Sequence, residues 1–231
     1  MSLLAPPYEA DGGRVLFVVP HPDDEVLGCG AALLAHARAG SPIDVLQVFD
    51  GALGNPSGSA EPELALRREA ELLASLQTLV PDAPPTLLSW GLPEGHAPSS
   101  ADLAHAALRL ELLLRERRPT TVFAPWAGDA HPDHHSVSAA VATALDALGA
   151  EAPRAVAYEV WSDLDPDWVV VPEGDDWTTL ERALACHGSQ GGESELRAFL
   201  RERGRRRALS GRAFGQALAC FATRRSHGRA A

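Results

Sequence analysis

The sequence contains no lysine, because all 20 of its Lys and Arg residues are arginines. The absence of lysine excludes catalysis through a Schiff-base lysine, and it excludes the phosphate-binding lysine of a P-loop. Cysteine is also scarce, and Cys29, Cys186 and Cys220 form an odd, widely spaced set without a CxxC pair. Such a set argues against a disulfide framework, so we expect three small buried hydrophobic side chains without a catalytic role.

Neither a membrane span nor a signal peptide is recognisable in the sequence. No run approaches the ~20 apolar residues that cross a bilayer, and Met1–Arg14 lacks the basic and then apolar pattern of a secretory signal. We therefore expect a cytoplasmic protein with no membrane partner. The length of 231 residues and the hydrophobic content of 45% predict a single domain over residues 1–231, with its core between residues 14 and 222. A homo-oligomer is compatible with this composition.

Charge is distributed unevenly along the chain, whose net charge is −11. Ten arginines and one acid, Glu202, lie between Arg197 and Ala231, so this segment carries +9 and the remainder −20. The acidic remainder argues against nucleic acid or an anionic membrane as the main partner. We expect the arginine-rich segment to form a solvated helix face that pairs with the acidic body, with contact to an anionic molecule as the alternative.

Apolar runs rich in β-branched residues alternate with segments of helical periodicity. The runs predicted as strands are Val15–Val19, Ile43–Phe49, Thr86–Ser89, Thr121–Ala124, Arg154–Val160 and Trp168–Val171. The segments predicted as helices are Val26–Ala39, Glu63–Leu79, Ala101–Arg117, His135–Leu148, Thr178–His187, Glu195–Arg203 and Ala213–Phe221. This alternation predicts an α/β fold with a mostly parallel, Rossmann-like sheet of order 3-2-1-4-5, flanked by helices. The GxGxxG fingerprint of dinucleotide-binding proteins is absent after the first strand.

Two loops hold the densest groups of histidine and aspartate. The loop after the first strand, Pro20–Glu25, reads PHPDDE, and the loop after the fourth strand, Pro125–His134, reads PWAGDAHPDH. In open parallel sheets, ligands bind beyond the carboxyl ends of the strands at the point where the strand order reverses. Strands one and four are neighbours at that point in the predicted order. We therefore expect the two loops to meet in one pocket.

Histidine and carboxylate side chains in such a pocket favour a metal site. Imidazoles and carboxylates suit Zn²⁺ and Fe²⁺, and catalytic zinc generally takes three protein ligands and one water. The bound cation lowers the pKa of that water toward ~7, and a nearby carboxylate that does not bind the metal can serve as general base. Two histidines and one carboxylate from these loops would fit. Of the histidines elsewhere, His96 is a weak pocket candidate and His105 is expected on a helix surface.

The residues of these loops resemble two motifs of the PIG-L (LmbE-like) family of deacetylases. Val18–Glu25 with the following Gly28–Gly30 resembles the first motif, and His131–His134 resembles the second. Looser similarities to the family lie at Leu66–Glu71, at Trp90–Gly95 with Glu94 where Asp is common, at Tyr158–Trp161 and at Ser189-Gln190. The resemblance covers nearly the whole chain, from about Val15 to Phe221.

The resemblance implies a metal-dependent hydrolase with a defined set of ligands. Members of the family remove the acetyl group from N-acetylglucosamine amides in small molecules, and this chain is expected to do the same. Carried over to this sequence, the pattern implies that His21, Asp24 and His134 bind the metal. Zinc is the expected ion, and Fe²⁺ or another divalent metal would use the same ligands.

The family pattern also implies three catalytic residues and a substrate contact. Asp23 is expected to act as general base and then to protonate the leaving amine. His131 is expected to stabilise the oxyanion, and Asp133 to accept a hydrogen bond from His131 and keep it charged. Arg68 is expected to bind polar groups of the substrate, although Arg67 fits the family register as well. The expected partner is a small, soluble amino-sugar compound whose second group the sequence does not specify.

Three other functions fit parts of the pattern. An amidase acting on a larger thiol or sugar conjugate would use the same residues. A non-haem iron oxygenase would use His21, Asp23 and His134 as its facial triad, although such enzymes are usually built on β-barrels. A non-catalytic sugar-binding or metal-binding protein would be expected to lack Asp23, which this chain retains.

Overall fold

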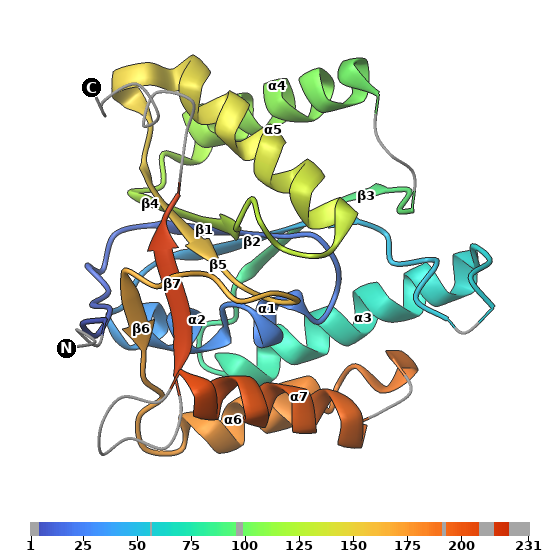
Figure 1. Cartoon of the computed structure of the whole chain (residues 1–231), viewed down its shortest axis with the longest axis vertical. Coiled ribbons are helices and arrows are strands. Elements are labelled where there is room, and N and C mark those ends of the chain that lie inside the picture. The colour runs from blue at the N-terminus through green and yellow to red at the C-terminus, as the bar shows by residue number, and fades with distance from the viewer. Residues whose placement is uncertain (1–4, 56, 96–98, 191–192, 208–214, 222–231) are drawn as a thin grey trace.

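A computed structural model of the chain describes residues 5–55, 57–95, 99–190, 193–207 and 215–221. Its strands are β1 (Val15–Val19), β2 (Ile43–Phe49), β3 (Thr86–Leu92), β4 (Thr121–Pro125), β5 (Arg154–Tyr158), β6 (Trp168–Val170) and β7 (Gln216–Cys220). They form one sheet in the order β3-β2-β1-β4-β5-β7-β6 (Figure 1). Strands β1 to β5 are parallel, whereas β7 is antiparallel to both of its neighbours. The predicted order 3-2-1-4-5 is confirmed, and β7 and β6 extend it.

Helices cover both faces of the sheet. They are α1 (Asp24–Leu27), α2 (Gly30–Arg38), α3 (Pro62–Leu79), α4 (Ser100–Arg117), α5 (Pro132–Leu148), α6 (Asp176–Leu184) and α7 (Glu193–Arg206), with short 3-10 turns at Gly149–Glu151 and Gly188–Gln190. Helices α4 and α5 lie on one face, and α1, α2, α3, α6 and α7 lie on the other (Figure 1). Each face has its own apolar cluster, with Leu33 and Leu72 in one and Val122 and Val141 in the other.

The sequence of each strand reflects its place between these layers. Every residue of β1, β2 and β4 is buried, because helices cover both faces of the central strands. The edge strand β3 instead contains no buried residue. The carboxyl ends of β1 and β4 therefore belong to the most deeply buried strands of the sheet, and the predicted pocket lies at these ends.

The helix predicted over Val26–Ala39 is two helices, α1 and α2, separated at Gly28 and Cys29. Gly28 lies so close to β5 that an added Cβ atom would be 2.4 Å from the ring of Tyr158. The chain can pass the Tyr158 ring at this distance only with glycine. The break ends α1 after four residues, so that the residues of the first loop remain at the end of the sheet.

The prediction of a helix over Ala213–Phe221 is wrong, because Gln216–Cys220 is strand β7. Alanine and leucine favour a helix in isolation, but this segment pairs with β5 and β6, and Leu218 is completely buried. Tertiary pairing thus overrides helix propensity here. The part of the prediction over residues 213–214 lies outside the described residues.

Two expectations about surface chemistry can be compared with the structure. Arginines of the C-terminal segment do pair with the acidic body, for example Arg207 with Glu159 at 2.6 Å and Arg206 with Asp163 at 3.3 Å.

Of the three cysteines, only Cys29 is buried as expected, whereas Cys186 is half-buried and Cys220, at the end of β7, is exposed. Among the described residues, no helix is long and apolar enough to cross a membrane.

Candidate metal centre

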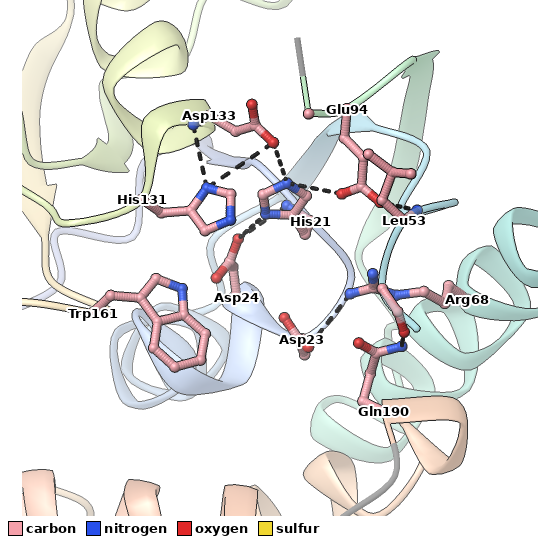
Figure 2. Close-up of a pocket in the computed structure, with 12 residues that line it drawn as sticks. His21, Asp23, Asp24, Leu53, Arg68, Glu94, His131, Asp133, Trp161 and Gln190 are labelled. Carbon is pink, nitrogen blue, oxygen red and sulfur yellow. Dashed lines mark hydrogen bonds and ion pairs between the residues drawn. The ribbon is translucent and has the colours of Figure 1, made fainter. Parts of the chain in front are cut away.

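The carboxyl ends of the neighbouring strands β1 and β4 face a cavity of about 290 Å³ (Figure 2). Six of the seven predicted site residues line it, namely His21, Asp23, Asp24, Arg68, His131 and Asp133. The seventh, His134, is completely buried beside Asp24. The structure thus brings together two distant loops, since His21 and Asp133 are in contact although they are 112 residues apart in the sequence.

One carboxylate oxygen lies between the two histidines predicted as metal ligands. Oδ2 of Asp24 is 3.4 Å from Nδ1 of His21 and 3.2 Å from Nε2 of His134. All three side chains are buried, and neither ring nitrogen of His134 makes a hydrogen bond within the described part of the chain. Two buried imidazoles that face one buried carboxylate oxygen form a donor set that fits a divalent cation such as Zn²⁺ or Fe²⁺.

Two groups of ligand atoms among the described residues lie within 4.8 Å of one another, and neither contains Asp24. One group is His21, His131 and His134, and the other is His21, Glu94 and Asp133. The ring centroids of His131 and His134 are 5.0 Å apart. His131 is therefore a geometric candidate for a metal ligand, although the sequence pattern assigns it to the oxyanion. Single variants of His131 and His134 distinguish these ligand sets.

Burial and neighbouring charges act against each other at the predicted ligands. Burial by itself would raise the pKa of Asp24, but the His134 and His21 imidazoles hold that pKa well below its usual range. Burial would lower the pKa of His134, but Asp24 and Asp129 raise it to about 10. Without a cation, His134 and Asp24 therefore form an ion pair. A divalent cation would replace the proton on His134, because only a neutral imidazole binds metal.

Asp129, to which the sequence pattern assigns no role, holds the second loop in place. Its Oδ1 is 3.3 Å from Nδ1 of His134 and accepts the His131 N–H at 3.1 Å. Its Oδ2 accepts the backbone N–H groups of Val160 and Trp161 at 3.0 and 2.9 Å. A carboxylate behind a metal-binding histidine fixes its tautomer and ring orientation. Asp129 stands two residues before the HPDH motif, but its contacts to residues 160–161 give no local sequence signal.

The structure does not contain the expected hydrogen bond from His131 to the Asp133 carboxylate. Oδ2 of Asp133 is 4.0 Å from Nδ1 of His131 but only 3.0 Å from Nε2 of His21. His131 is the N-cap residue of α5, and its Nδ1 accepts the backbone N–H of Asp133 at 3.2 Å. Burial and the neighbouring imidazoles lower the pKa of His131. Because Nδ1 accepts a hydrogen bond, a neutral His131 carries its proton on Nε2, which can still donate to a substrate oxygen.

Asp23 combines an unusual backbone with an unusual carboxyl group. Its φ of 108° and ψ of −27° lie in the left-handed region, which costs a residue other than glycine about 1–3 kcal/mol. Burial, aided by the Asp24 carboxylate, raises the pKa of Asp23 above its usual range, although Arg68 and His187 oppose the shift. A carboxyl group with a raised pKa can both accept and return a proton near neutral pH. Strained backbone of this kind is concentrated at functional sites.

The structure places the side chains of Arg67 and Arg68 in different surroundings. Arg67 has an exposed side chain and pairs with Glu71 at 3.1 Å, whereas Arg68 is buried in the wall of the cavity. Arg68 donates through Nη1 to the carbonyl of Gly51 at 3.1 Å and through Nη2 to the carbonyl of Pro22 at 2.7 Å. Its predicted contact with substrate stays a prediction, but its hydrogen bonds hold the backbone of both neighbouring loops.

Other cavity residues come from segments with only a weak sequence signal. The Glu94 carboxylate is 3.3 Å from Nε2 of His21, and the half-exposed Trp161 forms the opposite side of the cavity (Figure 2). Gln190 follows α6 and donates to the carbonyl of Gly54 at 3.2 Å. His105 is exposed on α4, as expected, and His96 lies outside the described residues.

The family model described as "PIG-L: GlcNAc-PI de-N-acetylase" matches residues 16–145, which is more than half of the chain. The chain belongs to the PIG-L family. The matched range includes every predicted metal-binding, catalytic and substrate-binding residue, from His21 to His134. Trp161 and Gln190 line the same cavity but follow the matched range, so the family match alone would miss them.

Relatives of this PIG-L protein include named deacetylases. It is 30% identical over 194 residues to the 1D-myo-inositol 2-acetamido-2-deoxy-alpha-D-glucopyranoside deacetylase of Mycobacterium sp. (strain KMS), an alignment that covers 70% of this chain and 63% of the relative. Its fold matches N,N'-diacetylchitobiose deacetylase from Pyrococcus horikoshii with a TM-score of 0.75 at 22% identity, covering 89% of this chain and 82% of the other.

The same fold also carries a different reaction. The 4-carboxy-2-hydroxymuconate hydratase GalB of Pseudomonas putida KT2440 matches with a TM-score of 0.71 at 18% identity, covering 91% of this chain and 97% of the other. The fold of a PIG-L protein therefore does not determine its reaction, which has to be argued from the site residues.

Proposed function

We propose that this PIG-L protein is a metal-dependent N-deacetylase that hydrolyses the acetamide of an N-acetylglucosamine unit in a small, soluble molecule. The observation that carries the proposal is the position of the Asp24 carboxylate between His21 and His134, beside a buried Asp23 in one cavity. The names of the inositol and chitobiose deacetylases support the substrate class. We further propose that the enzyme acts in the cytoplasm.

The ligands proposed for the cation are His21, Asp24 and His134, with zinc as the expected ion. When bound there, a divalent cation would acidify a water molecule and polarise the amide carbonyl. The fit rests on the donor set, in which two buried imidazoles face one buried carboxylate oxygen. The Asp129 and Asp133 carboxylates, behind His134 and His21, would orient the two imidazoles.

Two side chains are proposed to handle the charge and the proton of amide hydrolysis. Asp23 accepts a proton from the attacking water and passes it to the leaving nitrogen, which makes the amine a better leaving group. His131 donates from Nε2 to the carbonyl oxygen as negative charge develops on it. The helix cap at Nδ1 keeps the His131 ring in the tautomer that this role needs.

The alternative functions differ in the products or the structure that they require. An amidase for a larger conjugate would use the same residues and would release a longer acid. An iron oxygenase usually has a β-barrel, whereas this chain has an open, helix-flanked sheet. A non-catalytic binding protein gives no reason to retain a strained, buried Asp23. A hydratase, suggested by fold alone, would add water to a double bond and release no acid.

The decisive experiment measures acid release from a panel of amides. The purified chain is stripped with a chelator, reloaded with Zn²⁺ or Fe²⁺, and incubated with N-acetylglucosaminyl-inositol, N,N'-diacetylchitobiose and analogues with a longer acyl group. The proposal expects stoichiometric acetate and free amine, loss of turnover after chelation, and recovery on reloading. Release only of the longer acids would favour the amidase. No acid from any substrate with a loaded metal site would overturn the proposal.

A further inference from the structure

The peptide bond between Pro22 and Asp23 is held at both of its polar ends by buried charged side chains. Its carbonyl oxygen accepts from Nη2 of Arg68 at 2.7 Å. Its N–H, which belongs to Asp23, donates to Oε2 of Glu25 at 2.9 Å. Asp23, the residue that follows this peptide bond, has a φ of 108°, so the two contacts act where the backbone is strained.

Glu25 is itself fixed by two side chains from distant segments. Its second oxygen, Oε1, accepts from Ser75 Oγ at 2.6 Å and lies 2.7 Å from Nε2 of His187. Ser75 lies on α3, and His187 follows α6. Glu25, Ser75 and His187 are all buried, and the side chains of Glu25 and His187 are completely inaccessible.

Packing alone does not explain the contacts of Glu25. A buried carboxylate is costly unless it is hydrogen-bonded, and an apolar side chain would fill the same space without that cost. Here the two oxygens of Glu25 make separate contacts, because Oε1 faces the scaffold residues and Oε2 faces the Asp23 backbone. Arg68 and Ser75 lie seven residues apart on α3, and therefore share one helix face. That face holds the peptide through Arg68 directly and through Ser75 by way of Glu25.

We propose that Glu25, anchored by Ser75 and His187, is a positioning residue for Asp23. It fixes the strained Pro22–Asp23 peptide so that the Asp23 carboxylate faces the cavity while the neighbouring Asp24 faces His134. The inference rests on the proposed function, because it takes Asp23 to be the general base. None of Glu25, Ser75 and His187 needs to touch the substrate.

The test is a double-mutant cycle between Glu25→Gln and Asp23→Asn. Glutamine has one acceptor oxygen, so it cannot accept from Asp23 and from the Ser75–His187 pair through separate oxygens. Misplacing the base should lower kcat by ~10–100-fold, with KM and metal content nearly unchanged. In the Asp23→Asn background, E25Q should have little further effect, because the group it positions is gone. An equal loss in both backgrounds, or a change confined to KM, would overturn the inference.

Milder variants keep the inference testable if E25Q does not fold. Ser75→Ala and His187→Gln each leave Glu25 and one of its anchors in place, so each should give a smaller loss in kcat than E25Q. Thr78→Ala is the matched control for Ser75→Ala, since Thr78 lies on the same helix but its hydroxyl donates to the carbonyl of Ala74 and lies 3.6 Å from Sγ of Cys186, rather than against Glu25. Equal kcat for Ser75→Ala, His187→Gln and Thr78→Ala would contradict the proposal.

Crystal structures of the parent and E25Q separate this inference from the proposed function, because they need no turnover. The inference expects Asp23 to leave the left-handed region in E25Q, while His21 and His134 stay in place. If the parent releases no acid from any amide, the proposed function fails, and the φ of Asp23 still decides whether Glu25 sets its conformation. An Asp23 backbone identical in both structures would overturn the inference.

Discussion

The carboxylate of Asp133 contacts His21, with Oδ2 3.0 Å from Nε2, and so links the start of α5 to the loop after β1. A carboxylate that accepts from a metal-binding histidine orients the ring and raises its basicity. We therefore predict that Asp133→Asn weakens metal affinity by ~10–100-fold, the usual effect of removing such a partner. Competition with a chromogenic chelator measures it, and Asp82→Asn, at an exposed position, controls for the change in net charge. Unchanged affinity would show that Asp133 does not act through His21.

Alanine variants of His131 and His134 are predicted to lose different properties, catalysis in the first case and metal binding in the second. His134→Ala should lose the metal, because it removes a proposed ligand. His131→Ala should keep about one metal per chain while kcat falls by ~10²-fold or more, the usual loss for one oxyanion donor. Metal analysis of the purified variants, combined with kcat, separates the two results. Loss of metal from His131→Ala would instead favour the ligand set of His21, His131 and His134.

Arg68→Ala should lower kcat by ~10-fold or more, because Arg68 holds the carbonyl of Pro22 next to the proposed base. Arg67→Ala is the matched control: it removes the same charge one residue away, from an exposed side chain that contacts Glu71. Its kinetics should stay within about 2-fold of the parent, since exposed ion pairs contribute little. If Arg68→Ala raises KM and leaves kcat unchanged, the arginine binds substrate, as the family pattern implies.

The parts of the fold and site that the sequence predicts are those with a local signal. The buried strands β1, β2 and β4 are rich in apolar and β-branched residues, and the HPDDE and HPDH motifs follow two of them. The contacts of Asp129 with Trp161 and of Glu25 with His187 join segments 32 and 162 residues apart, and no periodicity encodes them. The predicted partner of Asp133 is wrong because proximity in sequence suggests His131, whereas helix capping turns the His131 Nδ1 toward the backbone.

The buried His36 on α2 should make stability depend on pH outside the metal centre. Its Nε2 lies 2.9 Å from the hydroxyl of Tyr8 and its Nδ1 2.9 Å from that of Ser41. Burial lowers the pKa of His36 from 6.5 to about 4, with Arg154 adding to the shift and Asp11 opposing it. The folded protein therefore binds fewer protons at this residue than the unfolded chain between these two pH values. Stability from this residue is complete above pH 6.5 and is lost as the pH falls toward 4.

The loss should reach at most about 1.4 kcal/mol of unfolding free energy per pH unit across that window. Urea unfolding of the chelator-treated parent and of His36→Gln, from pH 7.5 down to about pH 4.5, measures it. Glutamine cannot take up the proton, so the variant, although less stable at neutral pH, should lose less stability on acidification than the parent. Groups that titrate in both proteins cancel in this comparison, which leaves the contribution of His36. Parallel pH dependence in the two proteins would mean that His36 does not stay neutral in the folded state.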